Sequence, residues 1–414
     1  MNRKSVSGSI LSYSSAILFC RVASVVQGLV VIRLMEPGIL GIWLQLQLIT
    51  IYGGLAHFGL FNAVNRQVPF HRGRDEPDRA RYVENVVRGV LLIFFAAGLI
   101  VIGAMYFAGI TATERGRGVL TLVFITIVTL GINFHLGLFR ARHEFGRAGV
   151  ASVVSALVIV LGLPLVYYWG FDGLLSRAAI AATVGLVACI ALDGWNFSAT
   201  FDWKATVDLL RIGLPIMIVG LGTVAFASMD RTLIILLLDD NAMGQYAMCF
   251  ALAKVLALFP IAIGQVYYPR MTELYAAEGI SKPLIRRCIH ASALSAVIVG
   301  ILSSGAFLAM PWVIGEYFPK YAEGLPALKI ALISYFLLAL AAGPTYFAIS
   351  TVQKRRQLLA VVLGIVVTVA LAYAFSAHEL VGIAWSRVIG TTVYVSGLWV
   401  IVLRSRSGAR SAVP

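Results

Sequence analysis

Five basic side chains fall inside apolar stretches long enough to cross a membrane, and a carboxylate stands beside one of them. Moving a cation into the hydrocarbon region costs at least ~2.5–3.5 kcal/mol on insertion scales, unless the side chain reaches the interface or faces a polar cavity. Several such cations in one chain suggest an interior that binds an anion. These residues are Arg21, Arg231, Lys254, Lys329 and Arg387, with Asp230 directly before Arg231.

Arg21 and Lys254 lie deepest in their segments. Arg21 is about 12 residues into the first apolar run, which at the helical rise is ~18 Å and close to the middle of a bilayer. Ser24 and Gly28 follow Arg21 on one helical stripe, which favours other helices or water over lipid. A cavity lining and a structural contact between helices remain the two interpretations of Arg21. Lys254 is midway along its segment, which favours a cavity.

For the other charged positions the sequence leaves alternative roles open. Asp230 and Arg231 diverge by about 100° on a helix, so they need not pair with each other. Each either satisfies a neighbouring helix or has a binding role, Arg231 for an anion and Asp230 for a proton or a coupling cation. Lys329 and Arg387 are nearer to the ends of their segments, where long side chains can reach the interface.

The composition excludes most soluble classes of protein. The chain of 414 residues is 60% hydrophobic and 13% charged, with a mean hydropathy of +0.89, whereas a soluble domain carries about 25% charged residues. The net charge of +14 stands in short clusters between apolar segments, which is typical of membrane orientation and not of nucleic-acid binding. We therefore expect a multi-pass membrane protein with no nucleic-acid partner.

No sequence pattern predicts a metal, a cofactor or a catalytic centre. The four cysteines are widely separated and form no CxxC or Cys/His spacing. No Walker motif and no acid pair or nucleophile motif occurs, so we expect no enzyme and no bound cofactor. The apolar run near the N-terminus extends to about Met35, which is too long for a signal peptide and predicts a retained helix.

The elements that position these charged residues are predicted to be helices throughout. A bilayer core of ~30 Å needs about 20 apolar residues in a helix. Twelve segments meet this criterion, at residues 10–33, 38–60, 86–110, 117–139, 148–170, 173–193, 210–237, 241–268, 286–310, 322–350, 357–377 and 380–403. They predict an all-α integral membrane protein of two six-helix bundles, with a first lobe at 1–193, a cytoplasmic linker at 194–209, a second lobe at 210–403 and a cytoplasmic tail at 404–414.

Charge placement predicts the orientation. If the N-terminus is cytoplasmic, the cytoplasmic loops carry most of the Lys and Arg outside the membrane, as the positive-inside rule requires. Both termini are then cytoplasmic. A weak repeat supports two lobes of like orientation, because Leu40-Gly41-Ile42-Trp43 opens the second segment and Met243-Gly244-Gln245-Tyr246 opens the eighth.

The chain resembles the O-antigen and exopolysaccharide repeat-unit flippases, the polysaccharide branch of the multidrug/oligosaccharidyl-lipid/polysaccharide (MOP) exporter superfamily. The resemblance rests on an ordered set of short motifs over most of the chain. These are Leu40-Gly41-Ile42-Trp43, Gly59-Leu60-Phe61-Asn62 with Arg66, Ile212-Gly213-Leu214-Pro215, Asp230-Arg231, Gly244-Gln245-Tyr246 and Tyr268-Pro269-Arg270.

This resemblance implies a fold like that of the multidrug and toxin extrusion (MATE) transporters, with the two bundles around a central cavity and alternating access. It implies an undecaprenyl-pyrophosphate-type lipid-linked oligosaccharide as cargo, flipped across the bacterial inner membrane for lipopolysaccharide or exopolysaccharide synthesis. A polymerase and a chain-length regulator are implied partners. The cationic residues would bind the pyrophosphate. The alternative is a cation-coupled MATE multidrug exporter, and a third possibility is a scaffold that transports nothing.

Overall fold

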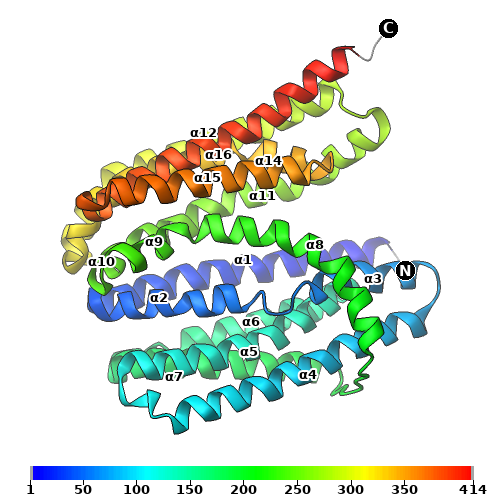
Figure 1. Ribbon diagram of the computed structural model, residues 1–414, viewed down its shortest axis with the longest axis horizontal. Helices are drawn as coiled ribbons and strands as arrows, with labels where there is room; N and C mark the ends of the chain where they lie inside the picture. Colours follow the sequence, from blue (N-terminus) through cyan, green and yellow to red (C-terminus); the bar gives the residue numbers. More distant parts are fainter. Residues whose placement is uncertain (1–2, 412–414) are drawn as a thin grey trace. The chain divides into compact units, whose positions relative to one another are not determined.

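The computed structural model describes residues 3–411, and the side chains of residues 13–218 and 220–405. This part of the chain is helical throughout and contains no strand (Figure 1). Ten helices are long and apolar enough to cross a membrane, and two shorter apolar helices accompany them at Pro37–Gly53 and Phe145–Leu161. The predicted all-α membrane fold is confirmed, and each of the twelve predicted segments falls on one helix or on consecutive helices.

The chain divides into two compact units. Unit 1 comprises Leu46–Leu221 with the residues up to Met35, and unit 2 comprises Glu36–Gln45 with the residues from Gly222 onward. Helix α2 (Pro37–Gly53) therefore begins in unit 2 and ends in unit 1, and α8 (Trp203–Ala227) runs the other way. The chain crosses between the units after Met35, within α2 and within α8. The segment 194–209 and α8 as far as Leu221 belong to unit 1. The predicted linker at 194–209 stays a prediction.

Unit 1 is built from α1 and α3–α7 with the adjoining parts of α2 and α8. Gly170, at φ 52° and ψ −122°, turns the chain within α7, at the predicted junction of the segments 148–170 and 173–193. The bounds are α1 (Arg3–Leu34), α3 (Leu60–Gly73), α4 (Pro77–Phe107), η1 (Ile110–Ala112), α5 (Glu114–Ala141), α6 (Phe145–Leu161) and α7 (Leu163–Leu192).

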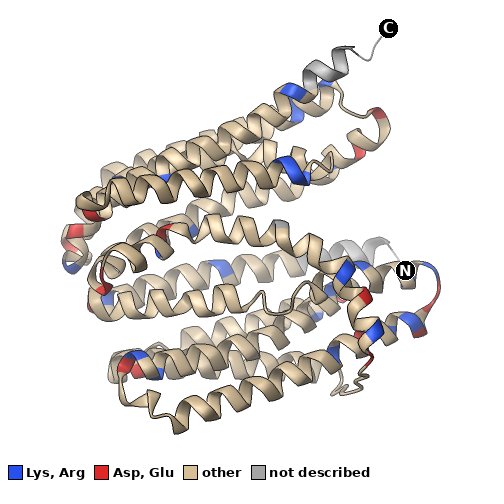
Figure 2. Ribbon diagram, viewed as in Figure 1, with Lys and Arg blue, Asp and Glu red and all other residues tan. Residues whose placement is uncertain are grey.

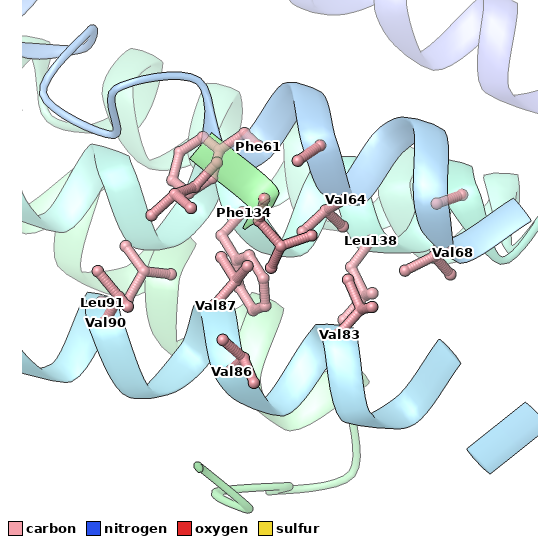
Figure 3. Packing of buried hydrophobic residues seen from close by; sticks show 14 of the residues in the cluster. Phe61, Val64, Val68, Val83, Val86, Val87, Val90, Leu91, Phe134 and Leu138 are labelled. Carbon is pink, nitrogen blue, oxygen red and sulfur yellow. The ribbon is translucent and has the colours of Figure 1, made fainter. Parts of the chain in front are cut away.

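The packing of unit 1 explains why α8 begins there. Buried valines of α4 interlock with α3 and α5, and Phe61 and Phe134 meet with ring centroids 6.1 Å apart (Figure 3). Leu209 of α8 is buried in the same cluster. In addition, Gly213 of α8 lies so close to Gly59 that a Cβ on Gly213 would be 1.9 Å from the Gly59 carbonyl oxygen. Small residues of this kind let membrane helices approach closely.

Unit 2 contains several interrupted helices. The α8–α9 break is at Ser228, the α10–α11 break at Tyr246 and the α13–α14 break at Ala341. The bounds are α9 (Met229–Leu237), α10 (Asp240–Gln245), α11 (Ala247–Glu278), α12 (Lys282–Tyr317), η2 (Pro319–Gly324), α13 (Leu325–Leu340), α14 (Ala342–Ser350), α15 (Lys354–Ala374), η3 (Ser376–His378) and α16 (Glu379–Ser411).

The start of α2 packs on α10 through the two glycines of the predicted repeat. A Cβ on Gly41 would lie 1.7 Å from the carbonyl oxygen of Asp240, and a Cβ on Gly244 would lie 1.8 Å from that of Pro37. The two contacts are mutual, as expected when repeat-related segments meet about a two-fold axis. Gln45 adds a hydrogen bond of 2.5 Å from its Nε2 to Asp240 Oδ1.

Charged residues gather at the helix ends and in the connecting segments, and long stretches of the helices carry none (Figure 2). This distribution is typical of a chain that crosses a bilayer many times. The exceptions inside the helices are the residues from which a functional site can be built.

Candidate functional site

The break between α8 and α9 places a carboxylate inside unit 2. Ser228 donates its hydroxyl to the Val224 carbonyl at 2.8 Å, which is a contact that bends helices. Asp230 follows in the first turn of α9, where the N-terminal amides favour a negative charge. Only 5% of Asp230 is exposed.

Asp230 is incompletely satisfied. Its Oδ1 has no hydrogen-bond partner in the described part of the chain, and the same holds for the hydroxyl of Tyr246 at the α10–α11 break. The Asp230 carboxylate interacts electrostatically with Arg231, Tyr246 and Tyr335. Tyr335 donates its hydroxyl to the Cys249 carbonyl at 2.8 Å and so closes the same region from α13. Two helix breaks thus surround a buried acceptor, an arrangement that transporters use for ion sites.

Arg231 is close both to the Asp230 carboxylate and to a second cation, Lys254. Arg231 is half-buried, with its guanidinium carbon 4.3 Å from the ring centroid of Phe250 on α11. Lys254, one turn further along α11, is exposed and repels Arg231 electrostatically. Two cations close to one carboxylate leave a net positive charge at this position. That charge can attract an anion.

Arg387 is buried rather than placed at an interface. Its Nη1 donates to the Phe226 carbonyl at 2.5 Å, and its guanidinium carbon lies 4.1 Å from the centroid of the Phe226 ring. Phe226 stands at the end of α8, where the helix break frees the last carbonyls, so Arg387 acts as a cap. Arg387 also interacts electrostatically with Tyr246 and Tyr335, so it borders the Asp230 region.

The other two predicted cations lie elsewhere. Lys329 of α13 is half-buried, with its Nζ 5.1 Å from the ring centroid of Phe307 on α12. Arg21 belongs to α1 in unit 1, where its side chain is exposed and has no hydrogen-bond partner among the described residues. The structure therefore brings together Asp230, Arg231, Lys254 and Arg387 within unit 2.

The sequence analysis did not predict one buried cation. Arg177 of α7 is 4% exposed and donates to Gln27 Oε1 at 3.0 Å and to the Ile159 carbonyl at 3.4 Å. Its Nε has no partner among the described side chains. Arg177 lies within the predicted segment 173–193, only four residues after its start. A long basic side chain so close to a segment end can reach the interface, so the sequence alone does not single it out.

A second buried charged group joins the ends of α4, α5 and α7. Asp193 receives hydrogen bonds from Arg142 at 2.6 Å and from Arg88 at 3.0 Å, and Glu84 pairs with Arg142 through both oxygens. Arg88 also donates to the Ser198 carbonyl at 2.7 Å. Both carboxylate oxygens of Asp193 are thus engaged with arginines. The four-residue spacing of Glu84 and Arg88 was the available signal of a shared helix face.

Arg142 shows how strongly this group is coupled. Burial alone would lower the pKa of Arg142, but the hydrogen bonds and negative charges of Glu84 and Asp193 outweigh burial and raise that pKa. The guanidinium therefore stays charged. The group fastens the segment after Asp193 to α4, and the Thr200 amide adds a hydrogen bond of 3.0 Å to the Asn85 carbonyl.

Among the described residues, no group of three His, Cys, Asp or Glu side chains is placed to hold a metal ion.

Comparison with known proteins gives a family and a fold. A family model described as "Polysaccharide biosynthesis protein" matches residues 7–275. Comparison with curated proteins gives no significant match.

Solved structures of MOP-superfamily type share the fold. An inward-facing multidrug resistance MATE family transporter of the MOP superfamily aligns with a TM-score of 0.79 at 15% identity, over 98% of this chain and 100% of the other. The lipid II flippase MurJ, in an inward closed conformation, aligns with a TM-score of 0.75 at 11% identity, over 94% of this chain and 87% of the other. The predicted MATE-like fold is confirmed.

Proposed function

The chain belongs to the polysaccharide biosynthesis protein family, and from this premise we propose that it flips a polyprenyl-pyrophosphate-linked oligosaccharide repeat unit across the cytoplasmic membrane by alternating access. The cargo would serve the synthesis of a surface polysaccharide. The similarity in fold to a lipid II flippase supports transport of a lipid-linked glycan. We propose a transporter without a catalytic centre.

One observation carries the proposal, namely the pairing of Arg231 with Lys254. The protein holds these like charges within electrostatic range of each other, and Arg231 also interacts with the buried Asp230 carboxylate. Such repulsion is costly in a low dielectric unless an anion binds between the cations. A pyrophosphate supplies that anion, because its oxygens accept several charge-assisted hydrogen bonds.

The remaining residues take separate roles in this proposal. Arg21 is the contribution of unit 1 to the cargo, since it is exposed on α1. Arg387 holds the α8–α9 break in place and adds positive charge, and Lys329 contacts outlying parts of the cargo. Asp230, with its unpartnered oxygen, is the proposed site of a proton or coupling ion. We propose that the moving parts are the lobes 1–193 and 210–403. The cytoplasmic linker 194–209 joins them, and the cytoplasmic tail 404–414 follows the second lobe.

We further propose the bacterial inner membrane as the location, with both termini cytoplasmic. The charge bias of the loops supports this orientation. A polysaccharide polymerase and a chain-length regulator are the proposed partners, because the flipped unit must be consumed on the far side.

The test is complementation of a deletion strain with the double variant Arg231→Gln/Lys254→Gln. Hydrogen bonds to charged groups contribute about 1.5–3 kcal/mol each, so we expect surface glycan to fall at least tenfold while the lipid-linked intermediate accumulates. Lys354→Gln is the matched control, because it removes an exposed cation at the start of α15, which has no role assigned to it in binding the cargo. Equal protein levels in the membrane establish that the variants fold. Unchanged surface glycan in the double variant would refute the assignment.

A cation-coupled multidrug exporter is the second candidate, and the buried, incompletely satisfied Asp230 favours it. Cationic drugs would then bind the carboxylate directly. Asp230→Asn would make cells more sensitive to cationic drugs, whereas Arg231→Gln/Lys254→Gln would not. The opposite pattern, with glycan lost and drug sensitivity unchanged, supports the flippase.

A further inference from the structure

Three connecting segments of unit 2 meet around a pocket of about 330 Å³ at the end remote from the C-terminus. They are the α9–α10 connection, η2, and η3 with the start of α16. The polar residues lining the pocket are Asp239, Asn241, Gln245, Glu323, His378 and Glu379. None of them belongs to the Asp230 region.

The segments are held together by close backbone contacts. A Cβ on Gly324 would lie 2.1 Å from the Gln245 carbonyl oxygen, so only glycine allows η2 to approach α10 this closely. Gln245 donates from Nε2 to the Lys320 carbonyl at 2.9 Å. Glu323, between Lys320 and Gly324, is thereby directed to the pocket that Gln245 lines.

Gln245 itself points to a ligand. It is 4% exposed, and its Oε1 has no hydrogen-bond partner within the described residues. An unmade hydrogen bond at a buried polar atom costs about 1–3 kcal/mol, so a donor in the pocket would recover that free energy. The carboxylates offer further acceptors. Asp239 uses only Oδ1, which accepts from the Ala242 amide at 2.8 Å.

The charge of the pocket selects a cation with its own donors. Asp239, Glu323 and Glu379 bring three negative charges, and among the described residues neither glutamate forms an ion pair. His378 is the remaining titratable group that lines the pocket. Since the described side chains hold no arrangement suited to a metal ion, the fitting cation is an ammonium group, which donates three hydrogen bonds.

An apolar pocket of about 410 Å³ continues from this one. Phe375, Trp385 and Ile389 line it, and His378 and Val381 line both pockets. Trp385 is 43% exposed on the surface of α16, as tryptophans near a membrane interface often are. The combined site therefore suits an amphiphile, with an ammonium at one end and a hydrocarbon chain at the other.

We infer that the two pockets together bind a membrane lipid with a primary ammonium head group, such as phosphatidylethanolamine. The ammonium donates to Gln245 Oε1 and to the carboxylates, and a hydrocarbon chain lies along Phe375 and Trp385. His378 stands at the junction of the pockets, where a phosphodiester connects head and chain, and its ring N–H can donate to that phosphate. This inference is independent of the cargo.

The experiment measures lipid binding to the full chain in detergent by native mass spectrometry. The probes are dioleoyl phosphatidylethanolamine, dioleoyl phosphatidylcholine, dioleoyl phosphatidylglycerol and free ethanolamine. We expect the ethanolamine lipid to bind at least tenfold more tightly than the choline lipid, which keeps the charge but has no N–H donor, and the glycerol lipid to be weakest. Equal binding of the three lipids would overturn the inference, and so would free ethanolamine binding as tightly as the lipid.

Variants separate the two halves of the site. Glu323→Gln/Glu379→Gln should abolish the preference for ethanolamine lipid over choline lipid, while Glu114→Gln, an exposed glutamate in unit 1, should leave it intact. Trp385→Ala should weaken the binding of all three lipids several-fold, whereas Leu363→Ala, at an exposed site on α15, should leave their binding unchanged. All five positions are exposed, so an unchanged Tm without lipid establishes folding. An unchanged preference in the double glutamate variant contradicts the inference.

Discussion

Buried charged side chains have two different kinds of surroundings in this protein. Arg142, Arg88, Glu84 and Asp193 pair with one another through hydrogen bonds, and their formal charges sum to zero. Arg231 interacts with Asp230 and is repelled by Lys254, so two cations and one carboxylate gather here. Paired buried charges serve structure, whereas a surplus of one sign suits a binding site.

Breaking the paired group should destabilise unit 1. The variant Arg142→Gln leaves Glu84 and Asp193 with less compensation, and removing one partner of a buried pair costs about 3–5 kcal/mol. We expect the Tm in detergent to fall by several degrees, as measured by intrinsic fluorescence.

Arg140→Gln is the matched control for this measurement, because Arg140 is exposed two residues away and donates only to the Leu136 carbonyl of its own helix. An Arg142→Gln Tm equal to that of the Arg140→Gln variant would contradict a structural role for the group.

Helix interruptions are the main feature at the scale of elements. Apolar length alone predicts continuous helices at 210–237, 241–268 and 322–350, and the structure interrupts all three. Ser292 bridges one of the gaps, since its hydroxyl donates to the Leu340 carbonyl at 2.9 Å and accepts from the Gly343 amide at 3.1 Å. Freed backbone groups inside a membrane must find such partners, so each interruption depends on a side chain from another segment or turn.

The mutual glycine contact between α2 and α10 should tolerate no larger side chain. Gly41→Val and Gly244→Val would each place a Cβ under 2 Å from a backbone carbonyl oxygen, and overpacking of this kind costs about 1–3 kcal/mol. We expect both variants to lower the Tm measured by differential scanning fluorimetry.

Gly38→Val makes the same chemical change in α2 where a Cβ would meet nothing within 4 Å. Its Tm should stay close to that of the unmodified protein. Equal losses at Gly38 and Gly41 would mean that helix propensity, and not the contact, sets the effect.

At the scale of the molecule, two units are joined by helices that each begin in one unit and end in the other. The α2 and α8 helices both run across the division, and the chain crosses it once more between α1 and α2. Charges at the helix ends then determine how the molecule lies in the membrane.

Cysteine labelling tests the proposed orientation. In a background without Cys20, Cys189, Cys249 and Cys288, a membrane-impermeant maleimide should label Ala112→Cys in η1 on intact cells. Asp75→Cys, between α3 and α4, should react only after the membrane is permeabilised. Both residues are exposed, so accessibility depends on the side of the membrane. Labelling of Asp75→Cys on intact cells would reverse the orientation.

Much of the fold of this protein can be predicted directly from its sequence. The apolar segments, their number and the all-α fold follow from hydrophobic length, because a bilayer accepts a chain only as helices that satisfy their own backbone. The positions of charges within those segments are equally visible, and Arg177 was missed because it stands only four residues from the start of its segment.

Tertiary structure alone decided which charges are satisfied. Whether Asp193 binds a cation or two arginines depends on residues more than fifty positions away, such as Arg88 and Arg142. The same holds for Arg387, whose acceptor is a carbonyl of α8, and for the pocket formed by Gln245, Glu323 and Glu379. Hydrophobic periodicity indicates whether each residue faces lipid or protein. The free energy of a buried polar group, in contrast, depends on its neighbours in space.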